Sequence, residues 1–412
     1  MKSQNGRFEL LSLNAYWLGL SFMWNSLHVL VLPAVMLQYV ADSRKNTVLG
    51  LLTFAGLVLA MVIQPIAGGL SDRLNTRYGR RRPWIAAGTF GDLIFLGLMA
   101  AAGGLPMLAL AYIGLQFTSN IAHGPAQGMM HDRIPPERMG VASGMKNLFD
   151  MGGLVVSSLL VGSLLTENTL GLTLAAIAAV LVLSALVTIF GVHEAPVGEL
   201  PSRPAQAEPD QPGSSDQHFR RLILARLFFL AGVYGIQTFA QYFIRDTLAV
   251  PDPVKLTGDL LATIVLTLIG FSLVAGYLCD RLGRKPMHVA ASLLLATGSL
   301  LMTTAQTSTA ILIFGSVIGA GIGLFLSANW ALASDLAPLG KGGKYLGLTN
   351  IATAGAGALS RLAGPGIDAL NNTRPGEHLG YTALFVLAAV LTLVSLVFLR
   401  KVPEHIRMER AE

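Results

Sequence analysis

The stretch Gly276-Tyr-Leu-Cys-Asp-Arg-Leu-Gly-Arg-Lys285 decides the fold, because most of it occurs twice in the chain. Gly68-Gly-Leu-Ser-Asp-Arg-Leu74 matches its first seven residues at an offset of 208, and after four extra residues Gly79-Arg80 matches Gly283-Arg284 at an offset of 204. Six later residues recur at a constant offset of 203: Asp132, Pro135, Gly140, Gly144, Asn147 and Gly152 match Asp335, Pro338, Gly343, Gly347, Asn350 and Gly355. A register held over this length indicates two copies of one unit.

The composition indicates that lipid solvates most of the chain. Of 412 residues, 53% are hydrophobic and only 13% are charged, against about 25% charged residues in ordinary globular chains. A dozen spans of about 20 residues would use most of this length. No room is left for a sizeable water-soluble catalytic domain, so we expect a lipid-embedded protein that is not an enzyme. The single cysteine, Cys279, excludes an intramolecular disulfide and a cysteine-rich metal site.

Apolar runs of spanning length predict an all-α membrane protein with twelve transmembrane helices in two six-helix bundles. The runs fall at 10–37, 48–70, 84–103, 107–128, 141–165, 170–191, 222–244, 260–278, 286–304, 309–333, 345–367 and 379–399. Residues 193–219 carry five prolines among Glu, Asp, Gln and Ser, a composition that is typical of a flexible linker. We therefore expect an N-terminal bundle over 1–192, a cytoplasmic linker over 193–219 and a C-terminal bundle over 220–412.

The distribution of basic residues predicts the orientation. With the N-terminus in the cytoplasm, 21 of the 29 Lys and Arg residues lie on the cytoplasmic side, 5 on the other side and 3 inside spans. This asymmetry places both termini in the cytoplasm. The net charge of +6 then serves membrane topology, and we expect no nucleic-acid partner. No cleavage site follows the first apolar run, so we interpret it as a retained span of a multi-pass protein of the cell membrane.

The repeated loop has the residues needed for a latch. Glycines let helices approach closely, and an acid at a helix end is stabilised by the positive N-terminus of a neighbouring helix. Arginines offer planar forks to carboxylates such as Asp132. These contacts would hold the cytoplasmic side shut and break when it opens. The alternative is a plain basic loop that only sets topology.

Gly-x-Leu-x-Asp-Arg-x-Gly-Arg-Lys resembles the signature loop of the major facilitator superfamily, and Gly276 to Lys285 matches it without a gap. The resemblance covers nearly the whole chain and implies two bundles around a central solute cavity that opens to each side in turn. It assigns gating roles to matching positions in both halves. These are Gly68, Asp72, Arg73, Gly79 and Arg80 with Asp132, and Gly276, Asp280, Arg281, Gly283 and Arg284 with Asp335.

A finer resemblance concerns the substrate. Residues 77–85, Arg-Tyr-Gly-Arg-Arg-Arg-Pro-Trp-Ile, look like the lengthened loop of sucrose:proton symporters and, more loosely, of glycoside–pentoside–hexuronide cation symporters. Those families usually carry an arginine between the Gly-Pro at 124–125 and Asp132, where this chain has Gln127. Drug antiporters commonly carry an intramembrane arginine in helix 4 and a Gly-Pro-x-x-Gly-Gly pattern in helix 5, and this chain has neither.

Polar side chains at helical spacing mark the expected solute site. The run over 107–128 carries the clearest stripe, with further polar and aromatic residues in the spans at 10–37, 222–244 and 309–333. Amides, hydroxyls and aromatic rings on one face suit a neutral, polyhydroxylated solute. The alternative is that they hydrogen-bond between helices. The candidate solute-binding residues are Asn25, His28, Gln116, Asn120, His123, Gln127, Tyr234, Gln237, Gln241 and Trp330.

Five charges lie within predicted spans, and each is costly in lipid. Arg226 and Lys146 lie close enough to the cytoplasm to extend to water, and Arg361 can do the same at the far end of its span. Asp150 lies four residues from Lys146, so the two share a helix face and can pair. Burial disfavours a charged carboxylate and a cation favours it, so Asp150, Lys146 and Asp92 are candidates for proton coupling. A purely structural role for the Lys146–Asp150 pair remains open.

These features predict a secondary active transporter of a small polar organic solute. Sugars or glycosides are the first expectation, moved by alternating access and coupled to protons, by a monomer. No nucleotide-binding loop and no ligand cluster at metal spacing occur, so we expect no cofactor and no metal. Two alternatives are a proton-coupled exporter of amphipathic compounds and a transporter-like scaffold or receptor that moves nothing.

Overall fold

The computed structural model describes residues 2–74, 76–134, 138–166, 168–192, 214–248, 250–336 and 342–403. Every regular element in these ranges is helical, which confirms the predicted all-α class. The chain divides into two compact units. Unit 1 comprises residues 1–40 and 52–207, and unit 2 comprises residues 41–51 and 208–412. Most of the predicted linker lies outside the described residues.

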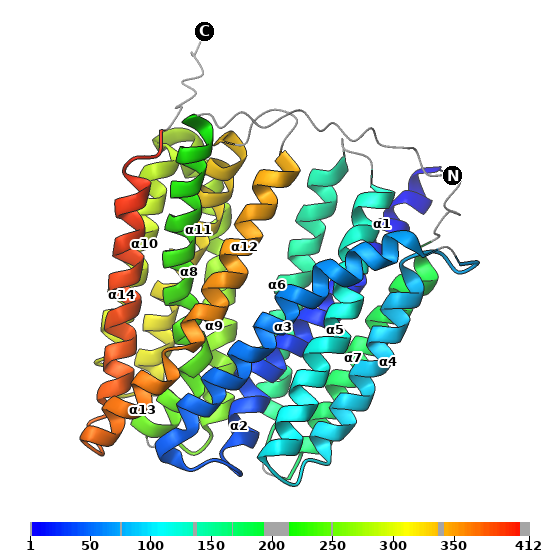
Figure 1. The fold of residues 1–412 in the computed structure, drawn as a ribbon. Coiled ribbons are helices and arrows are strands. Elements are labelled where there is room, and N and C mark those ends of the chain that lie inside the picture. The colour runs from blue at the N-terminus through cyan, green and yellow to red at the C-terminus, as the bar shows by residue number, and fades with distance from the viewer. Residues whose placement is uncertain are drawn as a thin grey trace. The chain divides into compact units, whose positions relative to one another are not determined.

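Unit 1 contains the first six membrane-spanning helices (Figure 1). They are α1 (Lys2–Asn25) with η1 (Ser26–Val31) and α2 (Leu32–Met36), α3 (Lys45–Arg73), α4 (Arg82–Ala100), α5 (Leu105–Arg133), α6 (Met139–Leu164) and α7 (Leu170–Gly191). Up to Leu51, α3 belongs to unit 2. Helix α1 packs against α6 and α7, and α4 packs against α5 and α7.

Unit 2 contains the other six spans. They are α8 (Ser214–Thr247), α9 (Pro253–Leu282), α10 (Arg284–Met302), α11 (Ser308–Leu336), α12 (Gly342–Arg361) with α13 (Gly364–Thr373), and α14 (Leu379–Leu399). The short helix η2 (Asp42–Arg44) also belongs to unit 2. Helix α8 packs against α12 and α14, and α10 packs against α11 and α14. These are the pairings of unit 1, with each span replaced by the span that holds the same place in unit 2, so the sequence repeat is also a structural repeat.

Twelve membrane-spanning helices in two six-helix bundles therefore form the molecule. Within the described ranges, ten helices are long and apolar enough to cross a membrane by length and composition. The other two are α10, which begins with Arg284, Lys285 and an early His288, and α12, which is rich in Gly and Thr. Both pack among the other helices of unit 2, so neighbouring helices cover their less apolar faces.

Small side chains allow the helices of each unit to approach closely. At Gly124 of α5, any side chain would collide with the backbone carbonyl of Gln64 in α3. At Gly323 of α11, it would collide with the carbonyl of Leu268 in α9. Such contacts are the usual basis of helix association in lipid.

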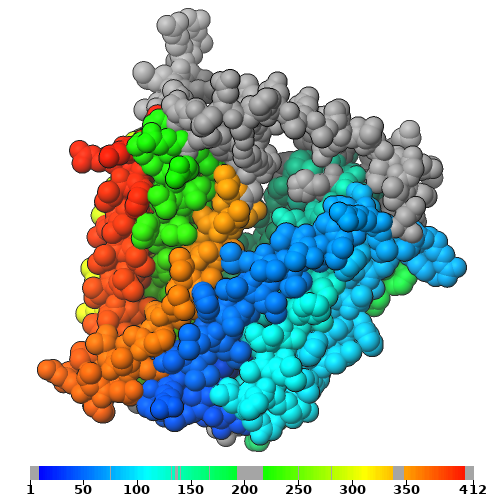
Figure 2. All heavy atoms as spheres, in the orientation of Figure 1, coloured from blue at the N-terminus to red at the C-terminus, as the bar shows by residue number. Residues whose placement is uncertain are grey.

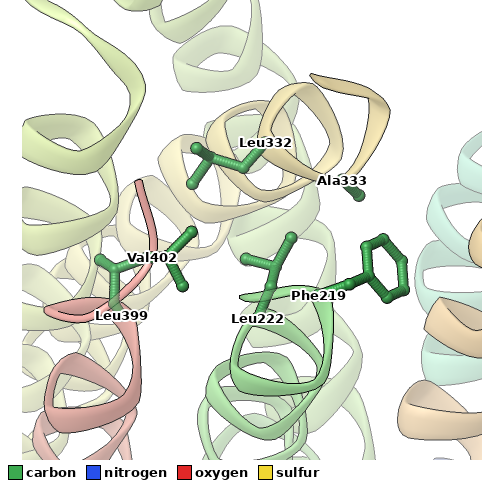
Figure 3. Packing of buried hydrophobic residues seen from close by; sticks show 6 residues of the cluster. All are labelled: Phe219, Leu222, Leu332, Ala333, Leu399 and Val402. Carbon is green, nitrogen blue, oxygen red and sulfur yellow. The ribbon is translucent and has the colours of Figure 1, made fainter. Parts of the chain in front are cut away.

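One end of unit 2 is closed by a cluster of apolar side chains from three helices (Figure 3). Phe219 and Leu222 of α8 pack with Leu332 and Ala333 of α11, and Leu399 of α14 and Val402 complete the cluster. Each is at most 2% exposed. This packing fixes the start of α8 against the ends of α11 and α14.

An apolar groove of about 340 Å³ runs between α8, α12 and α14. Figure 2 shows α8 in green between α14 in red and α12 in orange on this face of unit 2. The groove is lined by Leu, Ala, Gly and Phe side chains, and Ser360 supplies the one hydroxyl of this lining. A lining of this kind suits contact with lipid tails, as expected for a membrane-embedded chain.

Candidate functional site

The polar stripe predicted on 107–128 meets α1 in unit 1. Tyr112 and Gln116 of α5 form a triangle with His28: Nε2 of Gln116 donates to the Tyr112 hydroxyl at 2.7 Å, and the His28 Nε2 lies 2.9 Å from that hydroxyl and 3.3 Å from the amide. The Trp24 indole stacks on His28, with ring centroids 4.9 Å apart, and donates to Ser119 at 3.1 Å. We call these five side chains the α1–α5 polar cluster.

A π-helical turn aims His28 at the cluster. Residues Ser26–Val31 form η1, and the backbone N–H of Leu32 reaches back to the carbonyl of Leu27. Pro33 follows directly, and it lacks the N–H that would continue regular α-helical bonding. Single π-turns of this kind are frequent at functional sites. The sequence signal for this feature is the polar Ser-Leu-His run just ahead of Pro33.

The cluster has a packed floor, which Asn120 extends, and a more accessible rim, which Asn25 extends. Gln116 and Asn120 are 2% and 5% exposed, and Asn120 donates to the carbonyl of Gln116 at 2.7 Å. His28 and Asn25 are half-buried, and Asn25 is held by the Ser21 carbonyl at 2.8 Å. Gln116 and Asn120 are therefore placed to orient their neighbours, whereas Asn25 and His28 keep surface that a ligand can contact.

The Lys146–Asp150 pair lies against α1, the helix that also carries Trp24 and Asn25. Lys146 Nζ is 2.8 Å from Asp150 Oδ2, which confirms the predicted pairing. The ammonium also lies 4.1 Å from the ring centroid of Trp17 in α1, and the Ser21 hydroxyl donates to the Asp150 carbonyl at 2.6 Å. Trp17 in turn contacts His123 edge-on at 5.0 Å. Side chains of α1 thus connect the ion pair of α6 to His123 and to Asn25.

Two further candidates in unit 1 lie apart from these contacts. Gln127 accepts a hydrogen bond from Gln64 of α3 at 3.1 Å. Asp92 of α4 is 0% exposed, and its Oδ1 accepts from the Thr118 hydroxyl of α5 at 2.6 Å. Its Oδ2 has no hydrogen-bond partner among the described residues. Asp92 therefore faces protein on the α4–α5 contact, with no cation beside it in the described part of the chain.

The candidates of unit 2 are spread over two helices. Tyr234 and Gln237 of α8 are half-buried, and Gln241 is 3% exposed. Trp330 of α11 is 47% exposed. The four side chains therefore differ widely in burial, from the covered Gln241 to the exposed Trp330.

The two arginines expected to extend to water are instead buried. Arg226 is 7% exposed and donates to Asn329 Oδ1 at 2.7 Å and to Thr353 Oγ1 at 3.0 Å. Arg361 is 8% exposed and donates to the Gly357 carbonyl. Both guanidinium groups find polar partners inside unit 2, which replaces the need to reach water. The expectation for these two residues is therefore wrong.

In the first copy of the repeated loop, Arg81 forms the central contact. Its side chain is 5% exposed, and it donates to Asp132 at 3.0 Å, to the Gly68 carbonyl at 3.1 Å, to Ser71 and to Asp72. Arg80 also pairs with Asp132. Arg73, the first arginine of the family pattern, is exposed. The sequence analysis identified the loop but did not single out Arg81, which occupies the position of the motif's final lysine, Lys285 in the second copy.

The second copy repeats part of this geometry. Arg284 pairs with Asp335 as Arg80 pairs with Asp132. Arg281 is exposed and lies over the Tyr277 ring at 4.4 Å. Nothing is described for the side chain of Asp280. Gly79 and Gly283 have φ angles of 97° and 94°, so both repeats need glycine at the same turn.

A charged cluster in unit 2 was missed by the sequence analysis. Lys45, at the start of α3, is 4% exposed and pairs with Asp246 of α8 at 2.6 Å. Tyr381 of α14 donates to the same carboxylate at 2.6 Å. Asp368 of α13 is 5% exposed and accepts from Asn46 at 2.8 Å and from the Thr47 amide at 2.7 Å. These residues lie at the ends of apolar runs, where sequence reasoning expects solvated loop charges.

The chemistry available to unit 1 is recognition of polar groups beside a carboxylate that can exchange a proton. The described residues hold no group of three or more His, Cys, Asp or Glu side chains that could bind a metal ion. The cluster offers hydrogen-bond donors, acceptors and stacking rings, which are suited to hydroxyl groups and apolar ring faces.

Comparison with known proteins places the chain in a family. The model of the Major Facilitator Superfamily matches residues 16–360 and 253–411. Multidrug transporter protein MdtP of Bacillus subtilis is 30% identical over 26% of this chain and 20% of its own length. Proton-associated sugar transporter A of Mus musculus is 26% identical over 32% of this chain and 19% of its own length. The matches thus span about a fifth of these relatives.

A solved structure extends the likeness to the whole fold. A bacterial homolog of the human lysosomal transporter Spinster, in an inward-facing and unoccupied conformation, has a TM-score of 0.74 at 15% identity and covers 97% of this chain and 96% of its own. At that identity the likeness concerns the fold alone. Together with the family match and the repeated loop, it leads to one assignment: the chain belongs to the major facilitator superfamily.

Proposed function

We propose that this transporter carries a small polar organic solute, a sugar or glycoside first of all, together with protons in the same direction. The observation that carries the proposal is the contact of the Lys146–Asp150 pair with α1, the helix that also presents Asn25 and His28. A solute bound at the rim of the α1–α5 polar cluster would move α1, and that movement would change the surroundings of Asp150.

The roles divide as follows. Asn25, His28 and His123 contact the solute, while Gln116 and Asn120 orient them. Asp150 takes up and releases the proton, and Lys146 sets how readily it does so. Asp132 at the end of α5 and Asp335 at the end of α11 hold their arginines in each unit as part of the gate. The protein acts as a monomer in the cell membrane, with both termini in the cytoplasm.

Similarity to proteins named for sugar and proton transport supports this choice. Proton-associated sugar transporter A matches 32% of the chain, and the polar cluster has the donors and rings that polyhydroxylated solutes require. The test is uptake of labelled sugars and glycosides into proteoliposomes that contain the purified chain. We expect saturable uptake of at least one member, and no saturable uptake of any member would refute the sugar assignment.

The second candidate is export of amphipathic compounds in exchange for protons. It is favoured by the similarity to a protein named as a multidrug transporter, which matches 26% of the chain. The same proteoliposomes distinguish the two when they are loaded with a fluorescent amphipathic cation. Dye movement that is driven by a proton gradient, without sugar uptake, would select the exporter.

A further inference from the structure

Arg226 is a buried cation that forms no ion pair with any residue that the structure describes. Its side chain lies in α8 of unit 2, and the residue is 7% exposed. In the described part of unit 2, the ion pairs involve Lys45, Arg245, Lys255, Arg284 and Arg374, and none involves Arg226. A buried charge without an opposite charge is costly. A function that uses the charge would account for this cost.

The neighbours of Arg226 leave donors unused. Nη1 donates to Asn329 Oδ1 at 2.7 Å and Nε donates to Thr353 Oγ1 at 3.0 Å. Arg226 has only donors, so the atom of the Asn329 amide that it contacts must be the oxygen. The other terminal atom of the amide is therefore the nitrogen. That nitrogen, Nδ2, is buried and has no hydrogen-bond partner in the described ranges. Asn329 itself is 0% exposed.

Aromatic rings form the apolar wall of this site. The guanidinium carbon of Arg226 lies 6.0 Å from the ring centroid of Phe325, and Phe325 stacks on Phe229. His288 contacts the edge of Phe325 at 4.9 Å, and both of its ring nitrogens are buried without a partner among the described residues. A low-dielectric wall of this kind strengthens the attraction between a guanidinium and an anion.

We infer that Arg226 and Asn329 form a binding site for an oxyanion, the carboxylate or phosphate of a polar solute. The guanidinium presents a planar fork that fits either group, and the free N–H of Asn329 adds a donor beside it. The inference rests on the proposed transport function and narrows its substrate to an anionic polar solute. Neither Arg226 nor Asn329 is among the predicted solute-binding residues.

The test measures ligand-induced stabilisation of the purified full chain. A ligand that binds the folded state raises its unfolding temperature, and the probes are D-glucose, D-gluconate, D-glucose 6-phosphate and inorganic phosphate. We expect gluconate or glucose 6-phosphate to stabilise the chain at concentrations at which glucose and inorganic phosphate do not. Arg226→Gln should weaken that binding by about tenfold or more.

Asn329→Asp keeps the test informative if Arg226→Gln fails to fold. It places a carboxylate next to Arg226 and supplies the missing counter-charge. We therefore expect a chain that is at least as stable as the wild type and that no longer responds to the anionic probe. Gln306→Glu makes the same amide-to-carboxylate change at an exposed loop position of unit 2 and should leave the response unchanged.

Three results would overturn the site. They are equal stabilisation by glucose and its anionic analogues, no stabilisation by either analogue, and an unchanged response in Asn329→Asp. Stabilisation by inorganic phosphate alone would also contradict a solute site. The proposed transport function is judged separately, by uptake into proteoliposomes, so uptake of gluconate or glucose 6-phosphate by Arg226→Gln at the wild-type rate would remove this inference and leave transport standing.

Discussion

At the scale of single residues, Asp150 and Asp92 are two carboxylates that only their surroundings distinguish. Asp150 pairs with a cation, Lys146, that itself lies over an aromatic ring of α1, and 27% of the Asp150 side chain is exposed. Asp92 is 0% exposed and hydrogen-bonds Thr118. A coupling group must exchange protons with water in at least one conformation, so the exposed pair is the better choice.

We predict that Asp150→Asn abolishes solute accumulation driven by a proton gradient but leaves exchange of labelled solute intact. The substitution keeps the shape of the side chain and removes its proton chemistry, while the α1–α5 polar cluster is unaffected. Accumulation and exchange are measured in the same proteoliposomes. Asp92→Asn is the matched control and should retain both activities. Accumulation by Asp150→Asn would show that the Lys146 pair is structural.

A second residue-scale prediction concerns the turns after α3 and α9. Gly79→Ala and Gly283→Ala should each lower the free energy of unfolding by at least about 1 kcal/mol, because alanine is strained at φ angles near 95°. Gly69→Ala is the control, since a side chain there meets nothing within 4 Å. Thermal unfolding in detergent measures all three. Equal effects at Gly69 and Gly79 would contradict a conformational role for the turn glycines.

At the scale of elements, Arg81 connects the end of α3 to the end of α5. We predict that Arg81→Gln costs about 2 kcal/mol of stability, because it removes the hydrogen bonds of a buried guanidinium to Gly68 and Ser71, while Asp132 keeps Arg80. Arg73→Gln changes an exposed arginine of the same loop and should stay within about 0.5 kcal/mol. Chemical denaturation, followed by tryptophan fluorescence, compares them. A larger loss for Arg73→Gln would show that Arg73, and not Arg81, makes the central contact of the loop.

The contact of α1 with α5 gives the other element-scale prediction. Gln116→Leu removes the amide that bonds Tyr112 and lies next to His28, so we expect solute affinity to fall by about tenfold or more. Expression should stay normal, since an apolar side chain is tolerated between membrane helices. The affinity is measured as the concentration for half-maximal uptake. Phe117→Leu, on the exposed face of α5, is the control, and equal affinities in both variants would reduce the cluster to helix packing.

At the scale of the whole molecule, the sequence was sufficient for the fold. Apolar runs, the positions of basic residues and the repeat around Asp72 and Asp280 predicted twelve spans in two bundles, because lipid imposes long apolar helices. The pairing of Lys146 with Asp150 followed from helical spacing. The sequence predicted that loop arginines bind Asp132 but not that Arg81 makes the central contact, since that choice depends on packing. The roles of Lys45 and Asp368 could not be predicted, because their partners are far away along the chain. Arg226 was misjudged for the same reason, because its partners lie on α11 and α12.

Movement of protons with the solute is the central claim, and it can be measured directly. In a lightly buffered suspension of proteoliposomes containing the wild-type chain, solute is added outside without any imposed gradient, and the external pH is recorded. Symport carries protons inward with the solute, so we predict that the external pH rises and that Asp150→Asn abolishes the rise. A fall in external pH would indicate exchange for protons, and solute uptake without any pH change would show that transport is not coupled to protons.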